Sequence, residues 1–306
     1  EAKIDDTVYR KEDILAGKGN FDDVDFIFST WGMPVFTSDE ISEYFPSLRC
    51  VFYSAGSVQF FARPFLEKGI KVFSAWTANA VPVAEFTVSL ILLASKGFLP
   101  LCSRMSRGDV SGARKLCVGF PGNYGETIGI IGAGKIGRLV IESLRRHELE
   151  IAVFDPFLPD FAAKELGVVK CSLPELFEKS FIISNHLANN AQTKGMLDYG
   201  LFSEMRKNAT FINTGRGAQV VEDDLVRILT ERPDITAILD VTDPEPPIDG
   251  HPFFGLDNCY LTPHIAGSGG DEVHRMPYYM IDQFRKYISG QKCEFEVSAE
   301  MLATMA

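Results

Sequence analysis

The stretch TIGIIGAGKIGRLVIESLRRHELEIAVFDP, residues 127 to 156, decides the fold of this chain. An apolar run meets Gly132, Gly134 and Gly137 in the spacing G-x-G-x-x-G, and apolar residues at helical spacing follow at once. This order predicts a strand, a tight turn and a helix. In such a turn the first glycine allows a sharp bend, the second lets the backbone approach a pyrophosphate, and the third lets the helix pack closely on the strand.

A second apolar strand, residues 151 to 154, ends at Asp155, at about the 20-residue distance from the turn that a dinucleotide site requires. A carboxylate there accepts hydrogen bonds from the ribose hydroxyls of NAD and repels the extra phosphate of NADP. The free N–H groups at the start of the helix would face the phosphates. We therefore expect NAD as the cofactor. The alternative is a tight turn in another doubly wound domain, with Asp155 as a cap of the strand end.

Length and composition narrow the classes of protein. The 306 residues, 46% of them hydrophobic and 23% charged, are enough for about two globular domains. The net charge of −11 provides no basic stripe for nucleic acid and disfavours anionic membranes. A few well-placed arginines could still form a local site for an anionic substrate.

The six cysteines are scattered, with no C-x-x-C pair and no spacing of metal ligands. This pattern is typical of reduced thiols in a cytoplasmic protein, and no metal is expected. No run of 18 apolar residues indicates a membrane span.

Short apolar strands alternate with segments of helical spacing along the chain, which predicts an α/β fold with parallel sheets. A helix is expected to begin with Ser38 as its N-cap, and the apolar helix at residues 83–98 is expected to be buried. Residues 100–125 have weak periodicity and are interpreted as the passage into the nucleotide domain, and residues 269–288 are expected to form the last helix. Strands are expected at residues 25–29, 50–53, 70–74, 127–131, 151–154, 181–184, 210–213, 235–240 and 260–262, the last being the final strand.

Ligands of an open parallel sheet bind beyond the carboxyl ends of its strands, where three chemically active residues stand. The planar guanidinium of Arg216 suits a carboxylate and the neighbouring carbonyl oxygen of a 2-oxo acid. His264 could deliver a proton to a substrate oxygen at neutral pH. Glu245, between Pro244 and Pro246, could pair with His264 and favour the imidazolium form.

Together these groups describe a reaction. Reduced nicotinamide would supply hydride to a carbonyl carbon, His264 would supply the proton to its oxygen, and Arg216 would hold the carboxylate and polarise the carbonyl. The reverse reaction is oxidation of a 2-hydroxy acid. The structural alternatives are a surface arginine in a flexible turn, a hydrogen-bonded histidine at a strand end and an exposed turn acid.

The order of these motifs resembles that of the D-isomer-specific 2-hydroxyacid dehydrogenase family. The segments N-A-V-P-V-A-E-F at 79–86 and H-L-A-N-N-A-Q-T at 186–193 are also similar to family segments. The similarity extends from about Ser54 to Gly270. The ordered motifs are the glycine motif with Asp155, then N-T-G-R-G at 213–217, D-V-T-D-P-E-P at 240–246 and T-P-H-I-A-G at 262–267.

The resemblance implies two doubly wound parallel-sheet domains, with a Rossmann nucleotide domain inserted into a flavodoxin-like substrate domain. Residues 1–99 would be the first part of the substrate domain, 100–270 the NAD-binding domain, and 271–306 a C-terminal helix that returns to the substrate domain. It also implies a homodimer built largely on the nucleotide domains.

The resemblance assigns roles to individual residues of this chain. Arg216, Glu245 and His264 would be catalytic, and Asp240 would support them near the nicotinamide. The substrate would bind to Arg216, His264 and the loop Ala55, Gly56, Ser57 and Val58. The cofactor would bind to Gly132, Gly134, Lys135, Ile136, Gly137, Asp155, Pro156, His186, Thr193, Thr214, Gly215, Arg216, Asp240, His264 and Gly267.

The sequence also departs from the family pattern. Ala188 and Asn190 replace the usual proline and threonine of the cofactor loop, and residues 57–59 replace a run that usually contains aspartate. We expect an NAD-dependent oxidoreductase of small 2-oxo acids, of the glyoxylate, hydroxypyruvate or phosphoglycerate dehydrogenase type. The alternative is an NAD-sensing binding protein similar to the family's corepressors. A formate or phosphite dehydrogenase is less favoured, because formate enzymes of the family have glutamine where Glu245 stands.

Overall fold

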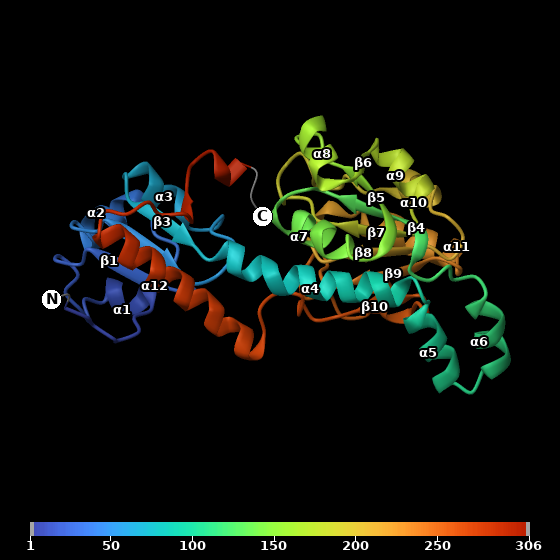
Figure 1. Ribbon diagram of the computed structural model, residues 1–306. Helices are drawn as coiled ribbons and strands as arrows, with labels where there is room; N and C mark the ends of the chain where they lie inside the picture. The colour runs from blue at the N-terminus through green and yellow to red at the C-terminus, as the bar shows by residue number, and fades with distance from the viewer. Residues whose placement is uncertain (1–2, 304–306) are drawn as a thin grey trace. The chain divides into compact units, whose positions relative to one another are not determined.

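The computed structural model describes residues 3 to 303, so the expectations for residues 1–2 and 304–306 lie outside the described residues. The chain divides into two compact units (Figure 1). Unit 1 contains the chain up to Asn79 and again from Asp271, and unit 2 contains residues Ala80–Gly270. The division falls within helix α4 (Trp76–Ala94), well before the expected boundary at residue 99. The reason is that Ala84 and Ile91 of this helix already belong to a core cluster of unit 2.

Unit 1 is built on a four-stranded sheet in the order β1-β2-β3-β11. The first three strands are parallel, as expected, and β11 pairs antiparallel with β3. The prediction that the final strand lies at 260–262 is therefore wrong, because a two-residue strand carries no periodic pattern that could reveal it. The bounds are β1 (Phe26–Ser29), β2 (Cys50–Tyr53), β3 (Lys71–Ser74), β11 (Glu296–Val297), α1 (Lys11–Leu15), α2 (Ser38–Tyr44), α3 (Ala62–Glu67) and α12 (Arg275–Ile288).

The last helix, α12, covers one face of this sheet. Its buried Met276 and Met280 pack with Phe52 of β2 and Phe73 of β3, whose rings stack with centroids 4.9 Å apart. The apolar residues of α2 and α3 belong to a separate cluster with Val51. Unit 1 is therefore completed by residues from both ends of the chain.

Unit 2 contains a seven-stranded, all-parallel sheet in the order β10-β9-β8-β7-β4-β5-β6. The strand order reverses at β4, whose neighbours are β5 on one side and β7 on the other, which confirms the expected doubly wound α/β fold. The strands are β4 (Tyr124–Ile131), β5 (Glu148–Phe154), β6 (Val169–Lys170), β7 (Ile182–Asn185), β8 (Thr210–Asn213), β9 (Thr236–Leu239) and β10 (Cys259–Leu261). The helices are α5 (Phe98–Ser106), α6 (Val110–Cys117), α7 (Lys135–Leu144), α8 (Asp160–Leu166), α9 (Leu173–Lys179), α10 (Tyr199–Ser203) and α11 (Glu222–Glu231).

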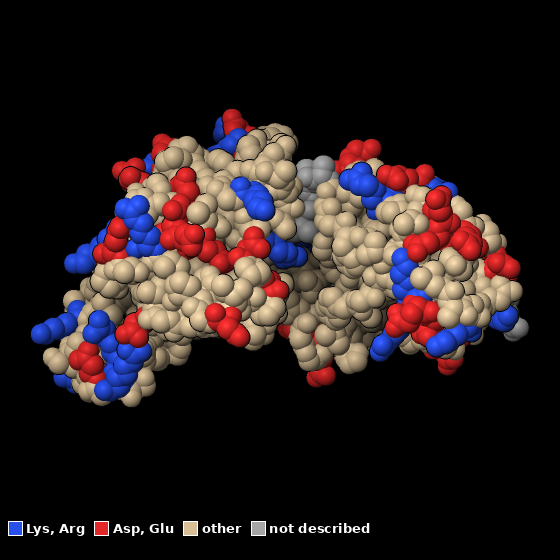
Figure 2. Space-filling view, turned by 180° about the vertical axis from the view of Figure 1, so that it is seen from behind, with Lys and Arg blue, Asp and Glu red and all other residues tan. Residues whose placement is uncertain are grey.

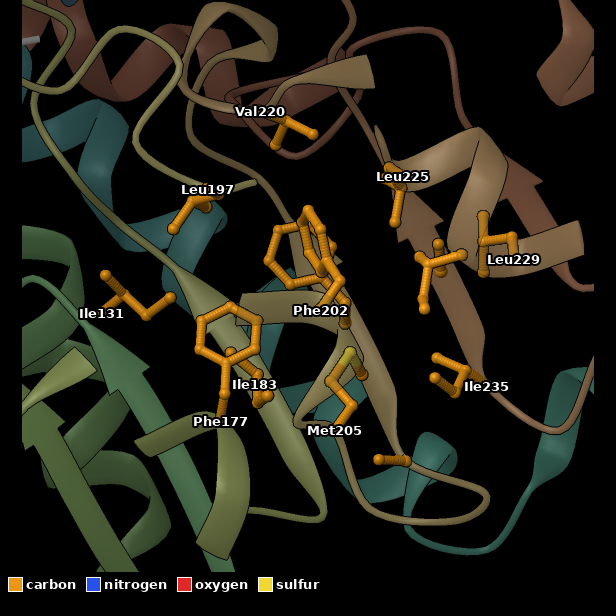
Figure 3. Packing of buried hydrophobic residues seen from close by; sticks show 14 of the residues in the cluster. Ile131, Phe177, Ile183, Leu197, Phe202, Met205, Val220, Leu225, Leu229 and Ile235 are labelled. Atoms are coloured by element: carbon orange, nitrogen blue, oxygen red, sulfur yellow. The ribbon is translucent and has the colours of Figure 1, made fainter. Parts of the chain in front are cut away.

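Two apolar clusters hold the sheet of unit 2. Figure 3 shows Phe177 beside Ile183 in the first cluster, with Leu225 and Leu229 drawn on the other side of Phe202. The second cluster joins Val140 and other residues of α7 to β4, β5 and α4. Strands β7, β8 and β9 in the middle of the sheet are consequently buried along their whole length, whereas both residues of the edge strand β6 are exposed.

Two expectations about helices are corrected by the structure. The N-cap of α2 is Thr37, whose hydroxyl accepts from the Glu40 N–H at 3.2 Å, and Ser38 is the first helical residue. Residues 100–125, whose weak periodicity predicts no helix, contain most of α5 and all of α6. They form helices because Pro100 lies in the first turn of α5, where its missing N–H is tolerated, and Asp109 caps α6 by accepting from the Gly112 N–H at 2.8 Å.

Helix α4 begins earlier than expected and is 19 residues long, with a mean hydropathy of 1.5 over an 18-residue window. By length and composition alone it could cross a membrane, a property that core helices of globular proteins share. Half of that window is buried inside the structure. On the face drawn in Figure 2, lysines and arginines are interspersed with acids and form no continuous basic stripe among the coloured residues.

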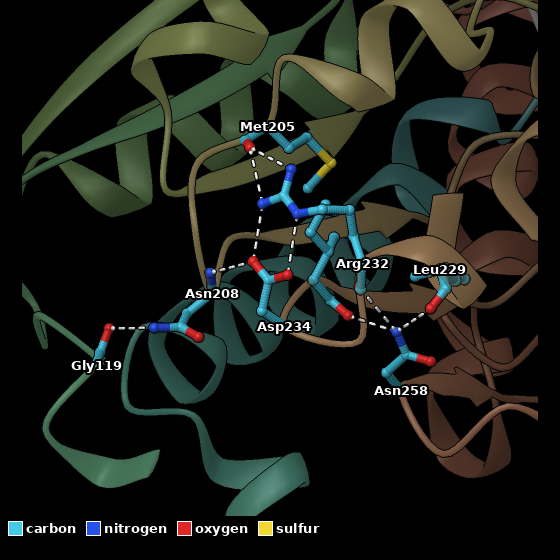
Figure 4. Close-up of polar contacts among 8 residues, drawn as sticks. Gly119, Met205, Asn208, Leu229, Arg232, Asp234 and Asn258 are labelled. Carbon is cyan, nitrogen blue, oxygen red and sulfur yellow. Dashed lines mark hydrogen bonds and ion pairs between the residues drawn. The ribbon is translucent and has the colours of Figure 1, made fainter. Parts of the chain in front are cut away.

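Polar side chains bind one another at the amino edge of the seven-stranded sheet, which here means the side where its parallel strands begin (Figure 4). Arg232 donates to both carboxylate oxygens of Asp234, at 3.0 and 2.8 Å. The Asn258 side chain donates to the carbonyl oxygens of Leu229, Arg232 and Ile235. These contacts tie the loops before β9 and β10 together at the edge opposite the glycine turn.

Candidate active site

The glycine turn has the geometry that its spacing predicts. Gly132 has a φ of +91°, and a Cβ there would lie 2.8 Å from the carbonyl oxygen of His186. At Gly137 a Cβ would collide with the carbonyl oxygen of Gly132. Gly134 is the N-cap of α7, and a Cβ there would meet no atom within 4 Å. The turn therefore presents open space in front of a helix N-terminus, which suits a phosphate group.

Asp155 closes this turn from the end of β5. One of its carboxylate oxygens accepts from the Ala133 N–H at 2.7 Å, and the other accepts from the Phe157 N–H at 2.8 Å. The acid expected to bind the ribose thus also fixes the glycine turn. Lys135 and Pro156 are exposed beside it, and Ile136 is half-buried.

The structure brings Arg216, Glu245 and His264 together. The Glu245 carboxylate lies 2.5 Å from Nδ1 of His264. Burial lowers the pKa of Arg216, and the nearby negative charge of Glu245 opposes that shift. The side chains of His264 and Glu245 remain 44% and 37% exposed, so the pair is open to a ligand.

Close packing places the turns that carry these side chains. A Cβ on Gly217 would collide with the backbone of Thr242 and Asp243, so only glycine fits there. The Asp243 N–H donates to the carboxylate of Glu222 at 2.9 Å, and the other oxygen of Glu222 lies 3.2 Å from Nε2 of His251. Burial raises the pKa of Glu222, while the Asp243 N–H and His251 act against it. Glu222 and His251 thereby hold the start of the loop that carries Glu245.

Asp240, which the family resemblance predicts to be a supporting residue, holds the loop after β10 through contacts that the sequence did not reveal. One oxygen of this buried carboxylate accepts from the Thr262 hydroxyl at 2.6 Å and from the Ile265 N–H at 2.8 Å. The other accepts from the Ala266 N–H at 2.9 Å. His264 lies within this segment with a φ of +55°, a conformation that ordinary residues rarely adopt. Asp240 therefore fixes the loop that presents the imidazole, just before Gly267.

The other predicted cofactor residues of unit 2 are placed around these turns. Nε2 of His186 lies 3.0 Å from the Ser184 hydroxyl, and desolvation lowers the pKa of His186 to about 4, so its ring is neutral at neutral pH. The Thr193 hydroxyl donates to the Ala188 carbonyl oxygen at 2.6 Å and so holds its own loop. The Thr214 hydroxyl lies 3.0 Å from that of Thr87 in α4.

Sequence reasoning selects Asn185 as a residue at a strand end, but it misses the cluster of fully buried amides that Asn185 forms with Asn213, at the end of β8, and Gln219. The backbone N–H of Gly215 donates to the side-chain oxygen of Asn213 in this cluster, at 3.0 Å. A glutamine inside the otherwise apolar run A-Q-V-V at 218–221 is the signal that could have pointed to it. Across residues 3 to 303, no group of three or more His, Cys, Asp or Glu side chains could hold a metal ion.

The predicted substrate loop, Ala55 to Val58, lies in unit 1 after β2. The buried Ser74 hydroxyl donates to the carbonyl oxygens of Ala55 and Gly56, at 3.0 and 2.6 Å. Ala55 and Val58 are buried, and Gly56 and Ser57 are half-buried. The loop is thus held in place by Ser74, and its binding of substrate stays a prediction.

The sheet order, the glycine turn and the acid at the end of β5 define a dinucleotide-binding α/β protein. A sequence profile described as "D-isomer specific 2-hydroxyacid dehydrogenase, NAD binding domain" matches residues 88–266, more than half of the chain. The chain therefore belongs to the D-isomer-specific 2-hydroxyacid dehydrogenase family and carries its NAD-binding domain.

Relatives with assigned names agree with this family. The D-3-phosphoglycerate dehydrogenase of Methanocaldococcus jannaschii is 31% identical over 229 residues, which are 74% of this chain and 43% of that protein. The enzyme of the same name from Archaeoglobus fulgidus is 31% identical over 202 residues, covering 66% of this chain and 38% of its own. The chain thus spans less than half the length of these relatives.

Solved structures share the fold. The D-mandelate dehydrogenase of Rhodotorula graminis superposes with a TM-score of 0.80 at 19% identity, over 94% of this chain and 87% of its own. A glyoxylate reductase from Paecilomyes thermophila gives a TM-score of 0.74 at 23% identity, over 95% and 88% of the two chains. At these identities the likeness concerns the fold alone.

Proposed function

We propose that the chain transfers hydride between NADH and a small 2-oxo acid, with the 2-hydroxy acid as the product. The observation that carries this proposal is the convergence of Arg216, Glu245 and His264 in the unit that contains the glycine turn. A guanidinium, an imidazole and a carboxylate together provide an anion anchor and a proton donor with its partner.

The residues at the glycine turn fit the cofactor. Gly134 leaves open space before the N–H groups of α7, and Asp155, which accepts from the Ala133 N–H of the same turn, would bind the ribose of NAD. When bound, NADH supplies the hydride. We assign Lys135 and Ile136, which follow Gly134, and Pro156, which follows Asp155, to the same cofactor site. His186, Thr193, Thr214, Gly215 and Gly267 are assigned to it as well.

The three residues divide the remaining chemistry. Arg216 binds the substrate carboxylate and draws electron density from the carbonyl oxygen. His264 in its imidazolium form donates a proton from Nε2 to that oxygen, because Nδ1 faces Glu245. Glu245 orients the ring and stabilises its positive charge. In the reverse direction the neutral imidazole accepts the hydroxyl proton.

The substrate is proposed as a small 2-oxo or 2-hydroxy acid of the glyoxylate, hydroxypyruvate or phosphoglycerate type. The segment Ala55 to Val58 would contribute backbone N–H groups to its carboxylate. The chain is proposed to act as a homodimer in the cytoplasm, without a nucleic acid or membrane partner. The six cysteines, all within the described residues and all free, are consistent with a reducing compartment.

A substrate panel tests the proposal. Oxidation of NADH is followed with glyoxylate, hydroxypyruvate, pyruvate and phenylpyruvate, and its reverse with 3-phosphoglycerate and NAD. Turnover with at least one acid is expected. Tight NADH binding without turnover on any of them would contradict the proposal and favour the NAD-sensing alternative, which the names of the relatives do not favour.

The choice of cofactor is tested at Asp155. Asp155→Asn keeps the size of the side chain but removes the charge that repels the phosphate of NADP. At close range in water this repulsion is about 1 kcal/mol, so the preference for NADH over NADPH should fall about fivefold or more. Asp160→Asn is the matched control, because Asp160 is an exposed acid on α8. An unchanged preference in Asp155→Asn would remove this assignment.

A further inference from the structure

We propose that Gln219 is a positioning residue that connects the substrate-anchoring turn of Arg216 to the loop that follows β7. The inference rests on the proposed function, because it takes Arg216 as the carboxylate anchor. Gln219 acts together with Asn185 and Asn213, and all three side chains are at most 1% exposed.

Gln219 makes four hydrogen bonds with its single amide. Its nitrogen donates to the carbonyl oxygens of Leu187 and Ala188, at 2.7 and 3.0 Å. Its oxygen accepts from the side-chain nitrogen of Asn185 at 2.6 Å and from the backbone N–H of Arg216 at 3.2 Å. Every donor and acceptor of the amide is used, so its orientation is fixed by the network.

The two asparagines extend this network to both turns. The Asn213 nitrogen donates to the Arg216 carbonyl oxygen at 3.1 Å, and its oxygen accepts from Asn185 at 3.0 Å. The Asn185 oxygen accepts from the Leu187 N–H at 3.2 Å. The backbone of Arg216 is therefore held at its N–H by Gln219 and at its carbonyl by Asn213.

This arrangement joins two predicted binding elements through one buried side chain. The guanidinium of Arg216 donates to the Gly215 carbonyl at 2.7 Å, so its direction depends on the turn that the amides hold. On the other side, Leu187 and Ala188 follow His186 in the predicted cofactor loop. Loss of the amide would leave buried backbone groups of both elements without partners, and both would shift toward new ones.

The hydrogen bonds that the Gln219 nitrogen donates and those that its oxygen accepts can be tested separately by mutation. Gln219→Met keeps the length of the side chain and removes all four hydrogen bonds. Gln219→Glu keeps the oxygen that accepts from Asn185 and Arg216, but it cannot donate to both Leu187 and Ala188. The matched control is Gln283→Met in α12 of unit 1, because Gln283 is also fully buried and accepts from the Glu294 N–H at 2.8 Å.

The experiment measures the NADH dissociation constant by fluorescence and the KM and kcat for the best acid of the panel. We expect Gln219→Met to raise both the acid KM and the NADH dissociation constant about tenfold. Gln219→Glu should raise the NADH dissociation constant by a similar factor and leave the acid KM within about twofold of the unmodified chain. Gln283→Met should lower Tm without changing either constant.

Two outcomes would overturn the inference: Gln219→Met matching Gln283→Met in both constants, or Gln219→Glu raising the acid KM as much as Gln219→Met does. If Gln219→Met fails to fold, Gln219→Glu still tests the inference, because it retains half of the contacts. In that variant the NADH dissociation constant should rise while the acid KM stays nearly unchanged. Absence of turnover by the unmodified chain would contradict the proposed function instead. The NADH titration would then still test the cofactor half of the inference, and unchanged binding in both Gln219 variants would overturn it.

Discussion

The two edges of the seven-stranded sheet in unit 2 are both lined with polar side chains, but the partners of those side chains differ. At the amino edge, Arg232 and Asp234 pair through two hydrogen bonds, and one Asn258 nitrogen serves three carbonyl groups. At the carboxyl edge, His264 contacts Glu245 through one nitrogen only, and both side chains remain more than a third exposed.

This difference separates stability from binding. Polar groups at the amino edge satisfy one another and close the sheet, so they have little capacity left for a ligand. At the carboxyl edge, where the strands end, the buried carboxylate of Asp240 and the three buried amides make hydrogen bonds within the protein. They hold the turns that carry the exposed His264 and Glu245, which can still form hydrogen bonds with a ligand. Substitutions at the two edges should therefore change different measured quantities.

The largest effect is expected at His264. His264→Asn removes the proton donor and should lower kcat by about 10²- to 10⁴-fold. Asparagine tolerates the positive φ at this position, so Tm and the NADH dissociation constant should stay close to those of the unmodified chain. Steady-state kinetics and NADH titration measure the two quantities, with the exposed His274→Asn as control. A parallel loss of NADH affinity would mean that His264 has a structural role.

The next effect is expected in the glycine turn. Gly132→Ala places a Cβ against the His186 carbonyl at a φ that alanine disfavours, which should destabilise the protein by about 2–5 kcal/mol. Gly134→Ala meets no neighbouring atom, so its Tm should change little while NADH binding weakens. Thermal unfolding and NADH titration distinguish the two variants. If both lost stability equally, the backbone account of this turn would be wrong.

A smaller, pH-dependent effect is expected at His186. Its pKa is lowered from 6.5 to about 4 by desolvation, so the unfolded chain binds this proton at a higher pH than the folded chain does. Stability should therefore fall as the pH drops from 6.5 toward 4, by about 3 kcal/mol for the full shift. His186→Gln should lack this component, which urea unfolding at pH 7 and pH 4.5 would reveal. Parallel pH profiles for the variant and the unmodified chain would refute the expectation.

The smallest effect is expected at the amino edge. The hydrogen bond from Arg232 lowers the pKa of Asp234, so the pair stabilises the protein above the ordinary carboxyl pKa and loses this effect as the pH falls below it. At neutral pH, Asp234→Asn should lower the unfolding free energy by about 1–2 kcal/mol and leave kcat and KM unchanged. Asp160→Asn, in an exposed ion pair, should change stability by less than about 0.5 kcal/mol. A changed KM in Asp234→Asn would contradict the separation of the two edges.

The sequence predicts what neighbouring residues determine. The glycine turn, the acid of β5 and the apolar strands depend on spacing within a few residues, and the structure agrees with each. Helices α5 and α6 were not predicted, because Pro100 and Gly112 are residues that usually interrupt helices. Pro100 is tolerated because it lies in the first turn of α5. Strand β11 is too short to have a period.

The contacts of the supporting groups could not be predicted for a different reason. Asp240 binds residues 22 to 26 positions away, and Gln219 binds carbonyls 31 and 32 positions away. No local pattern encodes such pairs, because they exist only after the parallel strands bring their ends together. Motifs indicated Arg216, Glu245 and His264, and the family resemblance indicated Asp240, but the contacts by which the buried groups hold these turns appear only in the folded structure.

The antiparallel strand β11 and helix α12 affect how the protein can be made. Unit 2 is contiguous, so its whole sequence is translated before the last part of unit 1. Until Met276, Met280 and β11 emerge, Phe52 and Phe73 lack their covering helix and the edge of β3 lacks its neighbour. During that interval the N-terminal segment of unit 1 exposes apolar side chains and an unpaired strand edge. Chaperones can bind this surface, and other chains can associate with it prematurely.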